Sequence, residues 1–139
     1  MTPYNDLLVS VSDAEALAAL LSDRRRSGRL EANAADALAD VLMDARMVPH
    51  DRLPADRVAM NARVAYREEP AGEARTVALV HPNEAAPSEG RISVLSPVGR
   101  ALLGRRAGSV TALSVPGGRA LTLRVLAIEP AVPAEEVPS

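Results

Sequence analysis

The spacing of the apolar residues changes once along this chain, and this change limits what the chain can fold into. Up to residue 48 they recur every three or four positions, as on one face of a helix, and from residue 58 they alternate with polar residues, as in a half-buried strand. Pro49 and Pro54 separate the two regions, and proline interrupts both helices and strands. We therefore predict an α+β protein with a helical part at 1–48, a linker at 49–57 and a sheet part at 58–130.

The helical part is predicted to contain two short helices. Ser12 and Glu15 have the spacing of a capping box, so the first helix begins at Ser12, and its apolar stripe stops before Gly28. A second stripe runs from Leu30 to Ala45. Neither helix can bury its narrow stripe alone, so we expect the two to pack as a short antiparallel coiled coil, a helical hairpin with its tip at 24–29.

Strands are predicted in the remainder at 61–68, 73–81 and 91–94, followed by a β-hairpin formed by 109–115 and 119–128. The hairpin turns at "PGG", where Gly117 suits the position that needs a positive φ. In the returning strand, Leu121, Leu123 and Val125 share one face. These elements predict an antiparallel sheet.

One short helix is predicted inside the sheet part, in "SPVGRALLG". Ser96 is a suitable N-cap, Pro97 suits the first helical position, and Gly104 can end the helix in the left-handed conformation. Beyond it, residues 131–139 are rich in proline and glutamate, and we expect a disordered tail.

Composition excludes several classes of protein. The chain is 47% hydrophobic without any apolar run near the roughly 18 residues that a membrane span needs, and its start lacks the features of a signal peptide, so we expect a cytoplasmic protein. It has no cysteine, which removes disulfides, thiolate catalysis and cysteine zinc sites. A net charge of −2 and only two aromatic residues, Tyr4 and Tyr66, argue against a dedicated nucleic-acid binder.

Catalytic and metal sites lack their usual parts. The only histidines, His50 and His81, have no ligand spacing around them. A row of aspartates at 36, 40 and 44 is more consistent with a solvated helix face than with a site. Asp23 and Glu31 could share a metal ion, but the arginines between them would neutralise them first. We predict neither a cofactor nor a metal, and no enzyme.

Four arginines gather at the predicted tip of the helical hairpin: Arg24, Arg25, Arg26 and Arg29. They could be a solvated loop whose charges suit the negative end of the first helix. They could also contact nucleic-acid phosphates or an acidic protein surface. The residues alone leave these three interpretations open.

The stretch "ISVLSPVGRALLGRRAGSVTALSVPGG", residues 92–118, resembles the C-terminal domain of bacterial GreA/GreB transcription elongation factors. It runs, as theirs does, from a strand through Ser-Pro and an Ala-Leu-Leu-Gly helix to a Pro-Gly-Gly hairpin. Upstream, "DRVAMNARVAYRE", "VALVHPNEA" and the two-helix start are similar to one branch of that superfamily, the regulator of nucleoside diphosphate kinase (Rnk). The resemblance implies an FKBP-like fold for the sheet part.

The resemblance also implies a partner and a mode of action. Gre-like proteins bind RNA polymerase as monomers, docking at the rim of its secondary channel and pointing the helical hairpin toward the active centre and its nucleic acid. In Gre factors, acidic residues at the tip hold a catalytic magnesium ion for transcript cleavage. Because this chain has arginines there, and guanidinium groups cannot be magnesium ligands, we expect a competitor of Gre factors without cleavage stimulation.

The resemblance places the docking surface at the Ser-Pro turn and its helix, and implies contacts from these residues: Leu95, Ser96, Pro97, Val98, Ala101 and Leu102. Capping alone also explains Ser96 and Pro97, and Ala101 and Leu102 are expected to face the sheet. Two other functions compete with this interpretation. A peptidyl-prolyl isomerase would need an aromatic-lined pocket, which Tyr66 alone cannot line, and fold is weak evidence for function. Nucleic-acid binding through the arginine tip would be weak and salt-sensitive.

Overall fold

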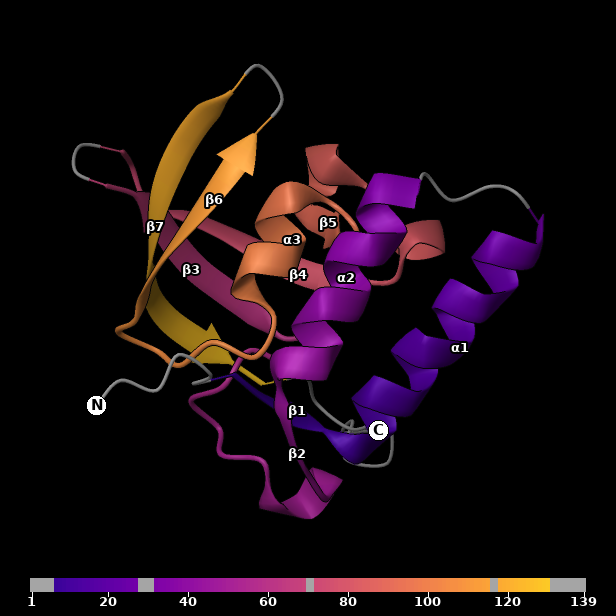
Figure 1. Ribbon diagram of the computed structural model, residues 1–139. Helices are drawn as coiled ribbons and strands as arrows, with labels where there is room; N and C mark the ends of the chain where they lie inside the picture. Colours follow the sequence, from indigo (N-terminus) through magenta and orange to yellow (C-terminus); the bar gives the residue numbers. More distant parts are fainter. Residues whose placement is uncertain (1–6, 28–31, 70–71, 116–117, 131–139) are drawn as a thin grey trace.

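The computed structural model describes residues 7–27, 32–69, 72–115 and 118–130 (Figure 1). It is an α+β structure, as predicted, with a helical hairpin packed beside a five-stranded sheet. The helices and strands, in chain order, are β1 (Leu8–Ser10), α1 (Val11–Ser27), α2 (Ala32–Asp44), β2 (Arg46–Val48), β3 (Arg63–Glu68), β4 (Arg75–Val80), β5 (Arg91–Ser93), α3 (Pro97–Leu102), β6 (Val110–Val115) and β7 (Arg119–Glu129).

The residue that caps the start of α1 is not the predicted one. The helix begins at Val11, and the hydroxyl Oγ of Ser10, not that of Ser12, accepts the Asp13 N–H at 3.1 Å. Ser10 is the last residue of β1, so the end of strand pairing determines where the helix begins. A Ser or Thr can cap only where the chain leaves its extended conformation.

The base of the helical hairpin is a two-stranded parallel sheet that the sequence analysis did not predict. β1 pairs with β2, with Leu8 opposite Arg46 and Ser10 opposite Val48. The Arg46 N–H also donates to the Leu7 carbonyl at 2.9 Å. The chain thus enters and leaves the helical hairpin along two adjacent strands.

The large sheet is mixed, with strand order β5-β4-β3-β7-β6, which corrects the prediction of an antiparallel sheet. β3 pairs antiparallel with β4 and β7, and β6 with β7, so the predicted β-hairpin is confirmed. Only the pair β4–β5 is parallel. Its connection contains two short 3-10 turns, Pro82–Glu84 and Pro87–Glu89, which return the chain before β5 begins.

An irregularity in β7 extends its buried face. Leu121, Leu123 and Val125 share the inner face as predicted, and Leu123 and Val125 are buried. Ala65 pairs with Ala127 but Tyr66 with Val125, so Leu126 is left out of the register. This bulge shifts the alternation by one residue and returns Ile128 to the buried side.

One cluster of buried side chains joins the helical hairpin to the sheet. Leu17 and Leu38 of the helices belong to it together with Leu79, Leu103 and Val125, and all five are 0% exposed. In Figure 1, α2 lies between α3 and α1. Whether 1–48 and 58–130 behave as separate domains, as the sequence division implies, stays a prediction.

Backbone bonds reinforce this junction at Gly104, which follows α3. Its carbonyl accepts the Leu8 N–H at 3.1 Å, and its N–H donates to the Val58 carbonyl at 2.9 Å. Its φ of 80° is the left-handed conformation predicted for it. A Cβ there would lie 3.3 Å from the Val9 side chain, so glycine also permits the close approach of β1.

Within these described ranges, no helix is both long and apolar enough to cross a membrane. The predicted tail, 131–139, lies outside the described residues, as does the turn position Gly117. Its neighbour Gly118 has a φ of 82°.

Candidate functional site

The turn before α3 is held by a compact set of hydrogen bonds around two serines. Ser96 caps α3 as predicted, since its Oγ accepts the Gly99 N–H at 3.1 Å, and the same hydroxyl donates to the Ser93 carbonyl at 2.7 Å. The Ser93 Oγ accepts the Leu95 N–H at 2.9 Å. Pro97 occupies the first position of the helix. The start of α3 is therefore fixed relative to the end of β5.

Gly99 allows α3 to lie directly against this turn. A Cβ on Gly99 would collide with the Ser93 carbonyl oxygen and would come within 3.0 Å of the Val94 Cα. No real Cβ is found so close to backbone atoms, so any side chain at this position would push the helix away. This requirement was not predictable from the sequence, because it depends on a neighbouring backbone.

The candidate docking residues divide by exposure. Leu95, Pro97, Val98 and Ala101 are half-buried and present some surface. Leu102 is 0% exposed and belongs to the core, so it cannot contact a partner while the domain keeps this structure, which corrects its inclusion in the docking surface. The Ser96 hydroxyl is already used within the turn.

Pro97 and Val98 lie side by side in sequence but border different hollows. Pro97 and Ala101 line an open groove of about 320 Å³ between α2, α3 and β6, together with Val41 of α2. Val98 lines a smaller cavity of about 170 Å³ on the sheet side. The start of α3 therefore forms a ridge with a hollow on each flank.

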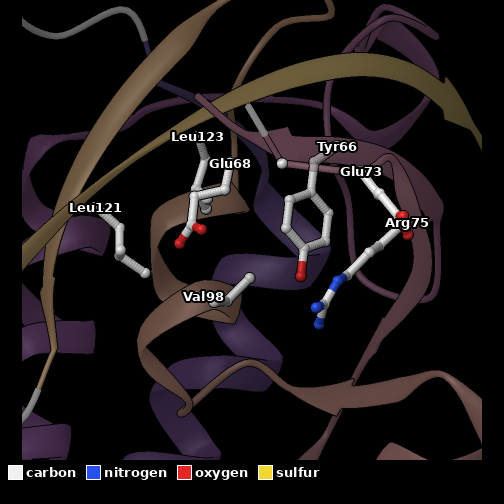
Figure 2. A pocket seen from close by; sticks show the side chains of 8 residues that line it. Tyr66, Glu68, Glu73, Arg75, Val98, Leu121 and Leu123 are labelled. Carbon is white, nitrogen blue, oxygen red and sulfur yellow. The ribbon is translucent and has the colours of Figure 1, made fainter. Parts of the chain in front are cut away.

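The cavity beside Val98 combines an apolar wall with charged groups (Figure 2). It is lined by Tyr66, Glu68, Gly72, Glu73, Arg75, Val98, Leu121 and Leu123. In Figure 2 the Tyr66 hydroxyl points toward the Arg75 guanidinium, and the two residues are directly paired between β3 and β4. Burial raises the pKa of the Tyr66 hydroxyl, and the positive charge of Arg75 partly offsets that rise.

This cavity was not predicted from the sequence. The pairing of Arg75 with Tyr66 depends on the register between β3 and β4, which the sequence of either strand alone does not give. Tyr66 is the one aromatic residue in the part of the chain that the structure describes. The rest of the lining is aliphatic or charged, which differs from the aromatic pocket that an isomerase would need.

Arg100 supports the ridge from the other side. Its Nη1 donates to the Leu95 carbonyl at 2.6 Å, so the guanidinium closes the turn across the start of α3. Burial lowers the pKa of this guanidinium. At neutral pH an arginine nevertheless stays charged, so the ridge carries a fixed positive charge.

The arginine tip is only partly visible. Arg24, Arg25 and Arg26 lie in the last turn of α1, whose backbone continues to Ser27. Their side chains, and Arg29, lie outside what the structure describes. Among the residues that it does describe, no three His, Cys, Asp or Glu side chains gather in a way that could hold a metal ion.

Comparison with known proteins gives these features a context. Residues 53–130 match the family model "Transcription elongation factor, GreA/GreB, C-term". The chain is 38% identical over 123 residues to the regulator of nucleoside diphosphate kinase of Escherichia coli (strain K12), which covers 88% of both chains. It is also 43% identical over 74 residues to transcription elongation factor GreA of Desulfovibrio desulfuricans, covering 53% of this chain and 46% of that one.

A solved structure is similar over the same extent. The prokaryotic transcription elongation factor GreA/GreB from Nitrosomonas europaea has a TM-score of 0.69 and 33% sequence identity, covering 88% of this chain and 97% of that one. An alignment of 123 residues is longer than the segment 53–130, so the match to the Escherichia coli protein includes part of the helical hairpin. The similarity therefore concerns the whole architecture and not the sheet alone.

Proposed function

The chain belongs to the GreA/GreB transcription elongation factor superfamily, in the branch of the regulator of nucleoside diphosphate kinase, and we propose that it is a noncatalytic transcription regulator that binds RNA polymerase. It docks at the rim of the secondary channel and competes there with Gre factors. It does not stimulate transcript cleavage.

The feature that supports the noncatalytic role is the chemistry of the tip. A magnesium ion in such a site needs carboxylate oxygens, whereas the last turn of α1 carries Arg24, Arg25 and Arg26. Three adjacent cations would also raise the cost of placing a divalent ion nearby. Docking without cleavage follows if the rest of the molecule still fits the polymerase.

The length of the helical hairpin supports the same conclusion. The 17 residues of α1 rise by about 25 Å and the 13 residues of α2 by about 20 Å, at 1.5 Å per residue. The resemblance to Gre factors implies a longer hairpin in those proteins than these arms. The tip then occupies the channel entrance without delivering catalytic groups to the active centre.

The proposed contact surface is the ridge at the start of α3. Pro97 and Val98 are half-exposed there, and the bonds among Ser93, Ser96 and Gly99 hold them in place. A rigid ridge loses little entropy on binding. Leu102 stabilises the ridge from below and makes no contact itself.

Binding to purified core RNA polymerase, with GreA as competitor, tests the first part. We expect wild-type protein to bind and GreA to displace it. Val98→Glu should weaken binding by about tenfold or more, because it places a charge in an apolar contact. The matched control Ala127→Glu, on the exposed side of β7, should bind like wild type. Absence of binding by the wild-type protein at micromolar concentration would refute the proposal.

A cleavage assay on a backtracked elongation complex tests the second part. GreA serves as the positive control, and the protein should leave the transcript intact while inhibiting cleavage by GreA. Stimulation of cleavage by the protein alone would show that the tip has been misinterpreted. Replacing Arg24, Arg25 and Arg26 by alanine should leave polymerase binding largely intact.

A further inference from the structure

The two edges of the five-stranded sheet are protected differently. β5, at one edge, has only three residues, and on its outer side Arg91 exchanges backbone hydrogen bonds of 2.9 and 3.1 Å with Ala86. β6, at the other edge, has six residues and contains neither a charged residue nor a proline. Short strands, charged side chains and prolines are common means of keeping an edge from pairing with another chain. The edge at β6 has none of these protections.

The hydrogen bonds between β6 and β7 show which backbone groups of β6 point to the open edge. The Val125 N–H donates to the Ser109 carbonyl at 2.9 Å. Bonded and non-bonded pairs alternate along an antiparallel ladder, so the register bonds Thr111 to β7 and turns the N–H and C=O groups of Val110 and Ala112 outward. In the part of the chain that the structure describes, no backbone group bonds to them from across the edge.

A hollow follows this open edge. It is the groove of about 320 Å³ between α2, α3 and β6, here called the edge groove. Thr111, Ala112 and Leu113 all line it, although successive side chains of a strand point to opposite faces. The hollow therefore reaches the edge of β6 and is not confined to one face of the sheet. Its other lining residues are Ala37, Val41, Pro97, Arg100, Ala101 and Arg105.

The backbone of β6, and not charge, selects what can occupy the edge groove. Charges of both signs lie around it, since Arg100 and Arg105 line the groove while α2 carries a row of aspartates. A helix uses its own N–H and C=O groups internally, so a docked helix would leave those of Val110 and Ala112 unpaired. An extended chain presents donors and acceptors at the same spacing as β6 and can pair with both residues.

A second copy of this chain fits the edge less well than a single added strand. Pairing β6 with β6 of another copy around a two-fold axis would bring that copy's α2 to the same edge groove as the first. The only charged residues of α2 are Asp36, Asp40 and Asp44, so like charges would approach one another. A single extended segment brings no such helix with it.

We propose that β6 binds an extended, uncharged segment of a partner protein, which pairs with the backbone groups of Val110 and Ala112 and adds one strand to the sheet. Alternate apolar side chains of that segment fill the edge groove against Ala101 and Leu113. Pro97 lies in both the edge groove and the ridge, so the bound segment competes with a protein docked on the ridge. The proposal does not depend on polymerase binding.

The test uses the full-length protein and a fluorescent peptide of alternating threonine and valine, about seven residues long and capped at both ends. We expect a dissociation constant of about 100 μM or below by fluorescence anisotropy. N-methylation of every second residue removes the donors along one edge of the peptide. Methylation of one alternate set should weaken binding by about tenfold or more and methylation of the other set should not, because only one edge of an added strand faces β6. Simple apolar adhesion would not distinguish the two sets.

Variants of the protein locate the site. Ala112→Pro removes an outward donor at a position where an edge strand tolerates proline, and should weaken peptide binding by about tenfold or more. Ala112→Ser keeps the N–H and is the matched control, with a change of less than about twofold. Val41→Glu places a charge in the edge groove without altering β6, and should also weaken binding by about tenfold.

Three results would overturn the proposal. The first is failure of the unmodified peptide to bind the wild type at about 1 mM. The second is an equal effect of the two methylation patterns, or unchanged binding by both Ala112→Pro and Val41→Glu. The third is a wild-type dimer, seen by sedimentation, that Ala112→Pro dissociates, because the occupant of the edge would then be a second copy of this chain.

Discussion

At the scale of single residues, the ridge depends on groups that each serve two purposes. The Ser96 hydroxyl caps α3 and also donates to the Ser93 carbonyl, and Gly99 both donates the capping hydrogen bond through its N–H and allows the helix to approach. The capping role of Ser96 was predictable, because it needs only local sequence. The close approach at Gly99 was not, because no local pattern shows which backbone will lie opposite.

The pH dependence of stability provides a prediction at this scale. Glu69 Oε2 accepts hydrogen bonds from Arg124 Nε at 2.6 Å and from Arg67 Nε at 3.1 Å. These bonds, the one from Arg124 first, lower the pKa of the Glu69 carboxyl. A carboxyl whose pKa is lowered by folding stabilises the protein above its unfolded pKa, and this contribution disappears as the pH falls through the lowered folded value.

We therefore expect Glu69→Gln to destabilise the protein at neutral pH, with a difference from wild type that shrinks as the pH falls through the lowered pKa of the Glu69 carboxyl. Urea unfolding at pH 7 and at pH 3 measures this. Glu84→Gln, in the exposed turn Pro82–Glu84, is the control. A Glu69→Gln difference that stayed constant between the two pH values would contradict the assignment.

At the scale of elements, local sequence patterns predicted whether a segment is a helix or a strand better than they predicted which strands pair. The two helices, α3 and the β6–β7 hairpin were predictable because their period, caps and turn residues are close in sequence. The parallel pair β1–β2 was not, since the whole helical hairpin separates its two strands in sequence and each strand has only three residues. The parallel pairing of β5 with β4 was not predictable either, because the direction of a strand depends on how the connecting turns run.

The attachment of α1 to the sheet part can be tested through one hydrogen bond. Asp13 Oδ2 accepts the Met60 N–H at 3.1 Å, and Met60 is buried. Asp13→Ala leaves that N–H without its acceptor and should lower the free energy of unfolding by about 1 kcal/mol. Hydrogen exchange at the Met60 amide should also become faster.

Asp13→Asn is the matched control, because its amide oxygen can still accept the bond. It loses the carboxylate charge at the N-terminus of α1, which is worth about 0.3–1 kcal/mol, but it should protect the Met60 amide more than Asp13→Ala does. Equal exchange rates at Met60 in the two variants would show that the hydrogen bond does not hold the elements together.

At the scale of the whole molecule, the helical hairpin and the sheet share one buried cluster. Leu17 of α1 and Val125 of β7 both belong to it and are both 0% exposed. A division into 1–48 and 58–130, derived from proline positions and a change of period, has no information about such contacts. A shared core predicts that the two parts unfold together.

Leu17→Ala tests this prediction. The substitution should lower the free energy of unfolding by about 2–5 kcal/mol because it leaves a cavity in the core. If the core is shared, amide exchange at Val64 and Val125 in the sheet accelerates with that of the helices. If the sheet amides exchanged as slowly in this variant as in the wild type, the helical hairpin would be an independent domain. Ala19→Ser, at an exposed position of α1, is the control.

The core also has an outer limit along the helical hairpin. Leu21 of α1 and Ala35 of α2 are the last buried side chains toward the tip among those described. Turns inserted beyond that level would lengthen the arms by about 1.5 Å per residue without disturbing any residue that holds the fold together. The length of the arms and the residues at the tip can therefore change without changing the core. One ancestral fold can then yield proteins whose helical hairpins extend to different depths into a partner.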